Sequence, residues 1–244
     1  MNEVKVLELR NPHSVIAVLQ NRPSDVIRLE LVGDGGGAAW RQARELAEQL
    51  GISIGHRDRS SQLTDRRQGS IGCVHARAPI DLNELIEKTD ESGLWLALDS
   101  VQDPQNVGAI FRVAAFFGVR GVLMGRDRTA PITSTVYDVA SGGVEEVPFS
   151  FETNLYRALD RVRDAGIWVL GSSEHAKRDI YSVPLDRAWM LVVGNEERGI
   201  RPRIRQICDD LARVTPSGKG ATHSLNVANA TAVLLGALSR PLSS

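Results

Sequence analysis

Three short polar clusters, each beside an apolar run, hold the residues of this chain whose types and spacing suit chemistry. Asn106 and Arg112 stand six residues apart where a predicted helix follows a buried strand. Gly194-Asn195-Glu196-Glu197-Arg198-Gly199 follows the apolar run of residues 189–193, and Ser224-Leu225-Asn226 precedes a long Ala/Val/Leu run. Loops that contain glycine at the ends of strands let backbone N–H and C=O groups approach a ligand closely. The three clusters therefore predict a ligand site at one edge of an α/β sheet.

Each of these residues also has a purely structural interpretation. Asn106 is a good helix N-cap, and Ser224 and Asn226 could cap the last helix in the same way. An arginine among apolar helix residues, as Arg112 is, usually reaches solvent along its stem. Glu197 could serve only to complement a helix dipole. The functional interpretation therefore depends on the three clusters occurring together.

Other chemistries fit the sequence poorly. Lys219 follows a glycine, but the GxxxxGK[ST] pattern of a phosphate-binding loop is absent, which argues against a nucleoside triphosphatase. His223 precedes Ser224 without the GxSxG turn of a hydrolase. Cys73 and His75 have no partner pair at the spacing of a zinc site, so we expect no metal.

Composition narrows the class of protein further. The chain has 244 residues, is 42% hydrophobic and carries a formal net charge of -1, so any nucleic-acid binding must come from local basic patches. Its two cysteines, Cys73 and Cys208, are far apart and favour a reduced, cytoplasmic protein. Residues 1–10 lack the apolar core of a signal peptide, and no apolar stretch is long enough to predict a membrane span.

The pattern of apolar residues predicts two domains. Residues 1–78 alternate short strands and helices and predict a small α/β domain, and residues 79–92 are acidic and polar like a linker. From residue 93 to residue 244 strands alternate with helices, which predicts a mostly parallel sheet covered on both faces. The strands are expected at 94–98, 121–124, 167–170, 189–193 and 211–214, and the helices at 107–117, 154–165 and 225–238.

The first domain carries a basic stretch that suits RNA. Residues 56–77 contain five arginines against two aspartates, and Arg57, Arg59, Arg66 and Arg67 are the candidates for phosphate contacts. The planar fork of arginine donates two hydrogen bonds to one phosphate. From charge alone, a solvated loop is about as well supported as contact with RNA phosphates.

In these clusters the sequence resembles the SpoU (TrmH-like) branch of the SPOUT RNA methyltransferases. The run with Asn106, Gly108 and Arg112 is similar to that family's motif 1, residues 193–199 to motif 2, and residues 224–227 to motif 3. The resemblance is strong over residues 94–240. Residues 1–78 resemble, more weakly, the substrate-binding domain of the ribosomal RNA members.

The resemblance implies a fold and an activity. The fold is α/β, with a trefoil knot in the C-terminal domain and a small N-terminal RNA-binding domain. The activity is transfer of a methyl group from S-adenosylmethionine to a ribose 2′-hydroxyl, for which a guanosine of 23S rRNA is the expected target. The implied partners are RNA and a second copy of the chain, which binds through the C-terminal domain, with no metal and no membrane.

The resemblance also assigns roles residue by residue. Arg112 would orient the hydroxyl, help to deprotonate it and contact RNA. The implied catalytic residues are Arg112, Asn106, Glu196, Ser224 and Asn226. The residues implied to bind the methyl donor are Gly194, Asn195, Glu196, Gly199, Thr215, Ser224, Leu225 and Asn226.

One segment departs from the family pattern. Where the family has Ile-Pro-Met and a single glycine, this chain has Thr215-Pro216-Ser217-Gly218-Lys219-Gly220, and the loop is about one residue longer. This difference concerns the contacts to the adenine, for which Thr215 is the candidate. Two other functions remain open: a tRNA 2′-O-methyltransferase, and a non-catalytic RNA-binding factor of ribosome assembly with the same fold.

Overall fold

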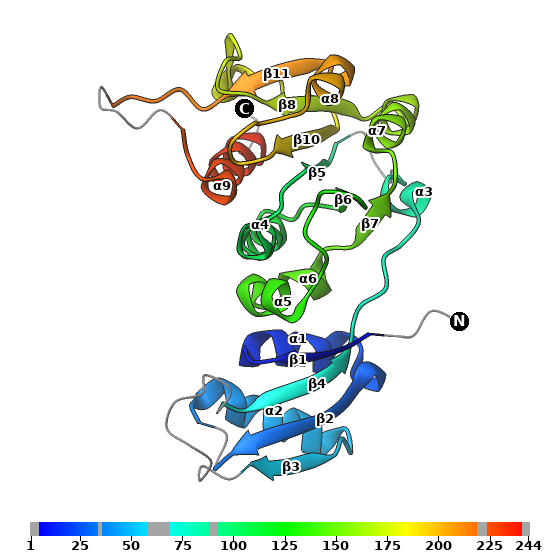
Figure 1. Cartoon of the computed structure of the whole chain (residues 1–244), viewed down its shortest axis with the longest axis vertical. Coiled ribbons are helices and arrows are strands. Elements are labelled where there is room, and N and C mark those ends of the chain that lie inside the picture. The colour runs from blue at the N-terminus through cyan, green and yellow to red at the C-terminus, as the bar shows by residue number, and fades with distance from the viewer. Residues whose placement is uncertain (1–4, 34–35, 58–68, 88–91, 219–223, 241–244) are drawn as a thin grey trace. The chain divides into compact units, whose positions relative to one another are not determined.

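The computed structural model describes residues 5–33, 36–57, 69–87, 92–218 and 224–240. The contacts divide the chain into two compact units (Figure 1). The first contains residues 1–78 and 132–146, and the second contains residues 79–131 and 147–244. In the described residues no helix is both long and apolar enough to cross a membrane.

The first unit is built on a small mixed sheet. Among its described residues, β1 (Val6–Leu9), β4 (Ile71–His75), β2 (Val26–Val32) and β3 (Ile54–Arg57) lie in that order. β4 is antiparallel to both of its neighbours, and β2 and β3 are parallel. The helices that residues 5–57 contribute to this unit in the described structure are α1 (Pro12–Asn21), the 3-10 turn η1 (Pro23–Asp25) and α2 (Ala38–Gln49). This matches the small α/β domain that the sequence predicts.

Residues 132–146, which lie between β6 and β7 in the sequence, group with the first unit, whereas the sequence prediction included them in residues 93–244. They form α5 (Ser134–Ala140) and α6 (Gly143–Glu146). Asp138 accepts hydrogen bonds from the backbone N–H groups of Arg10 and Asn11, at 2.8 and 2.9 Å. The buried carboxylate of Glu145 pairs with Arg22 at 2.8 Å. Buried apolar side chains, among them Val136, Tyr137 and Val144, pack beside these polar contacts. The local sequence does not show that they pack in the first unit.

The second unit is a parallel sheet, as the sequence predicts. Within its described residues the strand order is β7-β6-β5-β10-β8-β11-β9, and every neighbouring pair is parallel. The strands are β5 (Leu94–Asp99), β6 (Val122–Gly125), β7 (Phe149–Glu152), β8 (Trp168–Ser172), β9 (Arg178–Asp179), β10 (Trp189–Gly194) and β11 (Asp210–Arg213). β7 and β9 were not expected. β5 and β10 lie at the centre and are almost wholly buried because helices cover both faces.

Helices cover the sheet of the second unit in two groups. α3 (Leu82–Leu85), α7 (Leu155–Asp164) and α8 (Pro202–Ile207) share one hydrophobic core, in which Trp95 is fully buried and donates from its indole nitrogen to the Leu85 carbonyl at 2.8 Å. α4 (Pro104–Phe116) and α9 (Val227–Leu238) pack against each other (Figure 1). A short 3-10 turn, η2 (Ile180–Ser182), also contacts α9. The trefoil knot implied by the resemblance stays a prediction.

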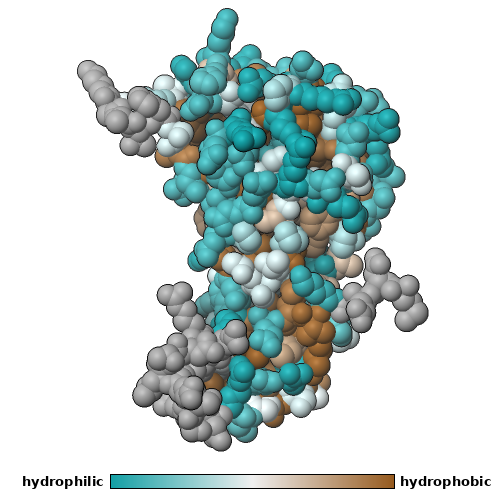
Figure 2. Space-filling model, viewed as in Figure 1, coloured by the Kyte–Doolittle hydropathy of each residue, from teal (hydrophilic) through white to brown (hydrophobic). Residues whose placement is uncertain are grey.

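The second unit has a polar surface and an apolar interior. Figure 2 shows mainly hydrophilic side chains on the face of the second unit that is turned toward the viewer. The apolar residues of its strands and inner helix faces lie inside. The polar clusters therefore lie on a framework that the core holds in place.

Candidate active site

The carboxyl end of β10 turns sharply into a closed loop. Asn195 and Gly199 exchange two backbone hydrogen bonds, of 3.1 and 2.9 Å, and Gly199 has a φ of 63°. A β-carbon on Gly194 would lie 2.2 Å from the Gly199 carbonyl carbon and 2.3 Å from the Ile200 nitrogen. Only glycine fits there, because real β-carbons do not approach backbone atoms so closely. The sequence interpretation of this stretch as a tight glycine loop is confirmed.

The side chain of Asn195 fixes the shape of this loop. Its Oδ1 accepts from the backbone N–H groups of Glu197 and Arg198 at 3.1 and 3.2 Å, which is the usual asparagine turn. Its Nδ2 donates to the carbonyl of Ser100 at 3.1 Å and to Glu196 at 3.1 Å. Asn195 therefore connects the loop after β10 with the loop after β5.

A buried carboxylate holds the far end of the loop. Asp99, the last residue of β5, is fully buried and accepts from the backbone N–H of Arg201 at 2.8 Å and from its guanidinium at 2.6 Å. Burial of an ionised carboxylate is tolerated only when it is paired in this way. Arg201 therefore has a structural role at this end of the loop.

Three side chains from the three sequence clusters form one chain of hydrogen bonds. Asn226 donates from Nδ2 to Oδ1 of Asn106 at 3.0 Å, and Asn106 donates from Nδ2 to Oε1 of Glu196 at 2.7 Å. The residues are 120 and 90 positions apart in the sequence, so only the folded sheet brings them together. A carboxylate that accepts an amide N–H stays oriented. The cluster is therefore a polar site whose geometry is set before any ligand binds.

The capping interpretation holds for one asparagine and fails for the other. Asp103, and not Asn106, is the N-cap of α4, because its carboxylate accepts the Gln105 N–H at 2.9 Å and Pro104 opens the helix. The helix thus begins three residues earlier than the sequence predicts, and the side chain of Asn106 is available for Glu196. Asn226 does cap α9, through the Ala228 N–H at 2.9 Å.

Arg112 lies on another side of α4. Six residues at about 100° each place it ~120° around the helix from Asn106. Its side chain is exposed and makes no hydrogen bond or ion pair with any residue that the structure describes. Among the described residues, the structure therefore unites Asn106, Glu196 and Asn226 and leaves the guanidinium of Arg112 without a partner.

A cavity of about 430 Å³ opens beside the β10 loop. Of the residues predicted to bind the donor, those that line it are Gly194, Asn195, Glu196, Gly199, Ser224 and Leu225. Thr215 and Asn226 do not line it, although Val214 and Pro216 do. Sequence reasoning missed the end of β8 and the residues that follow it, Ser172 to His175, together with Arg205 and Arg213. Since β8 neighbours β10, its carboxyl end must share this edge, but the strand order could not be read from the sequence.

The lining of this cavity suits S-adenosylmethionine. Val193, Ile200 and Leu234 offer apolar surface to an adenine ring, and the glycines expose backbone groups for its ring nitrogens. Glu196 and Glu197 place carboxylates where a sulfonium or an amino group can be balanced. A volume of this size lies within the usual range for small-molecule sites. The described part of loop 215–223, residues 215–218, contributes Pro216, and residues 219–223 lie outside the described part of the chain.

Thr215 is engaged by another residue. Its hydroxyl donates to the carboxylate of Asp179, and this bond, together with the Tyr181 N–H, holds the pKa of Asp179 below its usual range. Because hydrogen bonds to the charged form lower a carboxyl pKa, Thr215→Val should raise it toward the ordinary value. An NMR titration of the Asp179 carboxyl carbon measures this, and an unchanged pKa would show that the hydroxyl has no such effect.

The predicted RNA-binding arginines of the first unit are largely outside the described residues. Arg59, Arg66 and Arg67 all lie there. Arg57, at the end of β3, pairs with Glu30 at 3.2 Å. An arginine paired in this way can still contact a phosphate, but it must share its donors. The RNA-binding role of this stretch stays a prediction.

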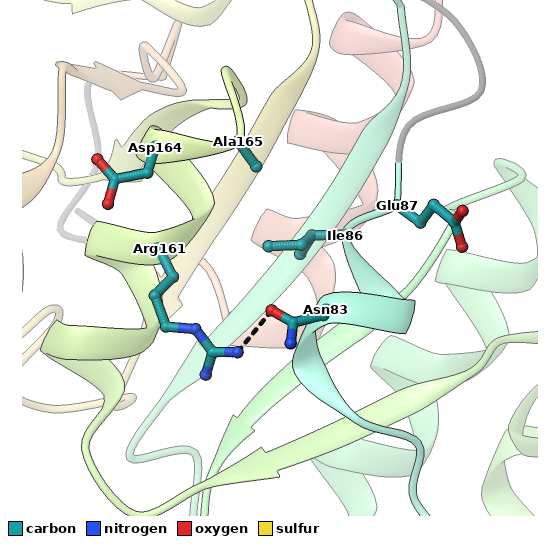
Figure 3. Close-up of a pocket in the computed structure, with 6 residues that line it drawn as sticks. All are labelled: Asn83, Ile86, Glu87, Arg161, Asp164 and Ala165. Carbon is teal, nitrogen blue, oxygen red and sulfur yellow. Dashed lines mark hydrogen bonds between the residues drawn. The ribbon is translucent and has the colours of Figure 1, made fainter.

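A second hollow, also of about 430 Å³, is lined by α3, α7 and the residues beside them (Figure 3). Arg161 reaches across it and donates to Asn83 at 2.7 Å, while Glu87 and Asp164 point away on opposite sides. None of the predicted site residues lines it. Among the described residues no three histidines, cysteines or carboxylates gather as metal ligands. The cavity beside β10 is therefore the better candidate for the active site.

Comparison with protein families and curated proteins identifies relatives over most of this chain. Residues 93–236 match the model of the SpoU rRNA Methylase family. The 23S rRNA (guanosine-2′-O-)-methyltransferase RlmB of Pseudomonas aeruginosa is 36% identical over 230 residues, which cover 91% of this chain and 92% of that protein. RlmB of Nitrosomonas europaea is 34% identical, with 91% and 87% covered.

Solved structures share the fold. The SpoU methyltransferase AviRb from Streptomyces viridochromogenes, in complex with the cofactor AdoMet, superposes with a TM-score of 0.79 at 22% identity and covers 96% of this chain and 89% of that one. A putative RNA methyltransferase of the TrmH family from Porphyromonas gingivalis gives 0.71 at 26%, with 96% and 89% covered. The A. aeolicus TrmH/SpoU tRNA modifying enzyme gives 0.53 at 25%, and it covers only 65% of this chain and 79% of its own.

The parallel sheet, with the glycine loop and the cavity beside it, has the fold of the SPOUT class of methyltransferases. The methyl donor is S-adenosylmethionine, as the family match and the curated relatives indicate. Within that class, the chain belongs to the SpoU rRNA methylase family. It is accordingly an RNA ribose 2′-O-methyltransferase.

Proposed function

We propose that the target of this enzyme is the 2′-hydroxyl of a guanosine in 23S rRNA and that it acts in the cytoplasm. The observation that carries the catalytic part is the chain Asn226–Asn106–Glu196, which joins all three clusters beside the cavity. The target is supported by the RlmB relatives, which are similar over nine tenths of this chain. A tRNA target is less well supported, because the tRNA modifying enzyme covers about two thirds of it.

Different residues of the site would bind the methyl donor and activate the acceptor. S-adenosylmethionine, when bound, supplies an activated methyl group on a positively charged sulfur. Gly194, Asn195, Gly199, Ser224 and Leu225 would hold it, chiefly through the backbone and apolar contacts. A rigid pocket is the main requirement, since methyl transfer depends on alignment above all.

The acceptor hydroxyl must be activated because it is a weak nucleophile. Arg112 carries the one catalytic guanidinium that we assign, and its donors are free among the described residues. A guanidinium beside the ribose lowers the pKa of the hydroxyl and binds the adjoining phosphate. Asn106 keeps Glu196 oriented toward the cavity, and Asn226 keeps Asn106 in place.

Methyl transfer to defined RNA tests the proposal. Wild-type protein and labelled S-adenosylmethionine are incubated in two separate reactions, one with unmethylated 23S rRNA and one with unmethylated tRNA. We expect label in 23S rRNA, recovered in 2′-O-methylguanosine after digestion to nucleosides. Label in tRNA alone would replace the proposed target. A protein that binds RNA but takes up no S-adenosylmethionine in calorimetry would be the non-catalytic factor.

We also propose that the chain works as a homodimer through α4 and α9. The sequence of α9, VANATAVLLGAL, has no charged residue, although a helix that packs on a sheet by one face normally has a polar outer face. Ala232, Val233 and Leu238 are half-buried, and Phe116 at the end of α4 is 83% exposed. An apolar surface of this kind is typical of a subunit interface.

Phe116→Glu should weaken this dimer. A charge at the centre of an apolar interface is left without a partner. It should raise the dissociation constant of the dimer several-fold to a hundredfold, which is a loss of about 1–3 kcal/mol in the free energy of association. Analytical ultracentrifugation across a range of concentrations measures the effect. Trp168→Glu, at another exposed aromatic residue (45% exposed) on β8, is the control and should leave the dimer unchanged. Equal dimerisation of both variants, or a monomeric wild type, would contradict the proposed interface.

A further inference from the structure

Two arginines of one short loop lie on the same edge of the sheet as the active site. The loop follows β6 and contains Arg126, Asp127 and Arg128, all exposed, and then Thr129 and Ala130, both buried. The register pairs Leu98 with Met124 and Asp99 with Gly194, so β6, β5 and β10 end level with one another. Neighbouring strands are about 4.8 Å apart, which places the ends of β6 and β10 ~10 Å apart.

The loop is attached to the strands on both sides of β6. The Arg126 N–H donates to the Glu152 carbonyl of β7 at 2.9 Å, and the Ala130 N–H donates to the Val101 carbonyl after β5 at 2.9 Å. Val101 directly follows Ser100, whose carbonyl accepts from Asn195 in the active-site loop. The backbone that carries the two arginines is thus connected to the active site by hydrogen bonds.

The conformation of Arg128 is unusual for its residue type. Its φ is 68°, in the left-handed region that favours glycine and asparagine. A residue with a β-carbon is disfavoured there, and such strain concentrates at functional positions. An arginine at this position therefore indicates a use for its side chain.

Neither guanidinium makes a hydrogen bond or an ion pair with any residue that the structure describes. On the β7 side, the carboxylate of Glu152 pairs with Arg161 at 3.6 Å. Asp127 lies between the two arginines in sequence, which leaves the tripeptide with a net charge of +1. Two guanidinium groups that have no partner among the described residues, held on a fixed backbone, match the phosphates of an RNA strand.

We propose that Arg126 and Arg128 bind the phosphate backbone of the substrate RNA beside the target nucleotide and so position its ribose over the Asn106–Glu196 site. The inference rests on the proposed methyl transfer to RNA and adds a contact that none of the three clusters contains. It predicts a purely electrostatic, sequence-independent contribution, because phosphate contacts position a strand without reading bases.

The test compares wild-type protein with an Arg126→Gln/Arg128→Gln double variant on one 23S rRNA fragment that the wild type methylates. We expect the dissociation constant for RNA to rise roughly tenfold or more. The slope of its logarithm against the logarithm of salt concentration should become shallower by about 1.4, since each phosphate contact on a single strand contributes about 0.7. Affinity for S-adenosylmethionine, measured by calorimetry, should be unchanged.

Three further variants keep the result interpretable. Arg126→Lys/Arg128→Lys keeps the charges and should retain the salt slope. Arg128→Gly relieves the backbone strain, so it should lower RNA affinity without lowering Tm. Arg187→Gln makes the same charge change before β10, where Arg187 stacks on Trp168, and should leave the RNA affinity unchanged.

Two outcomes are distinguishable. If the wild type methylates the fragment and the double glutamine variant has the same RNA affinity and the same salt slope, the role of Arg126 and Arg128 is refuted while the proposed function stands. If the wild type methylates no RNA, the proposed function itself fails, and the binding data then decide only whether the loop binds RNA.

Discussion

Arg112→Ala is expected to reduce methyl transfer by about 10²–10³-fold, the usual loss when one donor to a developing negative charge is removed. The affinity for S-adenosylmethionine should stay within about threefold of wild type, because Arg112 does not line the cavity. Stability should also be unchanged, since the side chain is exposed and has no partner among the described residues to leave unsatisfied. Single-turnover methyl transfer and calorimetry on the same preparation measure both quantities.

The Arg112 result can be separated from a general loss of positive charge. Arg112→Lys keeps the charge but not the planar fork, so we expect it to recover part of the lost rate. Arg187→Ala removes an arginine that stacks on Trp168 ahead of β10 and should transfer methyl groups at the wild-type rate. Wild-type activity in Arg112→Ala would remove this residue from the mechanism. A parallel loss of cofactor affinity would instead assign it to the cavity.

What the sequence predicted well is local. The glycine loop after β10 follows from an apolar run that ends at a glycine, and its bounds agree with the structure because Gly194 and Gly199 are both required by the turn. The parallel sheet follows from repeated alternation of strand and helix. The choice of Asn106, Glu196 and Asn226 came from the family resemblance, and the structure then placed the three side chains within hydrogen-bond distance.

What the sequence could not predict depends on contacts between distant residues. The lining of the cavity by Ser172 to His175 requires that β8 lie beside β10, which no local pattern encodes. The link between Thr215 and Asp179 spans 36 residues. Likewise α5 and α6 pack in the first unit through buried apolar residues and through Asp138 and Glu145, and the local sequence does not show which unit they join.

Gly194→Ala is expected to have the largest effect on structure of any single methyl group added to this site. The β-carbon would overlap three backbone atoms, the Gly199 carbonyl carbon and oxygen and the Ile200 nitrogen, at 2.2–2.4 Å. Backbone cannot rotate aside as a flexible side chain does, so the loop must open and the bonds between Asn195 and Gly199 must break. We expect a loss of about 3 kcal/mol in the free energy of unfolding, which is a fall in Tm of roughly 6–12 °C.

Gly194→Ala should reduce the binding of S-adenosylmethionine more than it reduces stability, because the loop that opens also lines the cavity and orients Glu196. At a temperature where the variant is still folded by circular dichroism, calorimetry should detect no binding of S-adenosylmethionine. Gly218→Ala is the matched control: it adds the same methyl group to the other glycine loop, where a β-carbon meets nothing within 4 Å and φ is not positive. That variant should be as stable as the wild type or slightly more so, because alanine restricts the unfolded chain. If the two variants melt at the same temperature and bind the cofactor equally, the close approach of Gly194 to Gly199 does not shape the site.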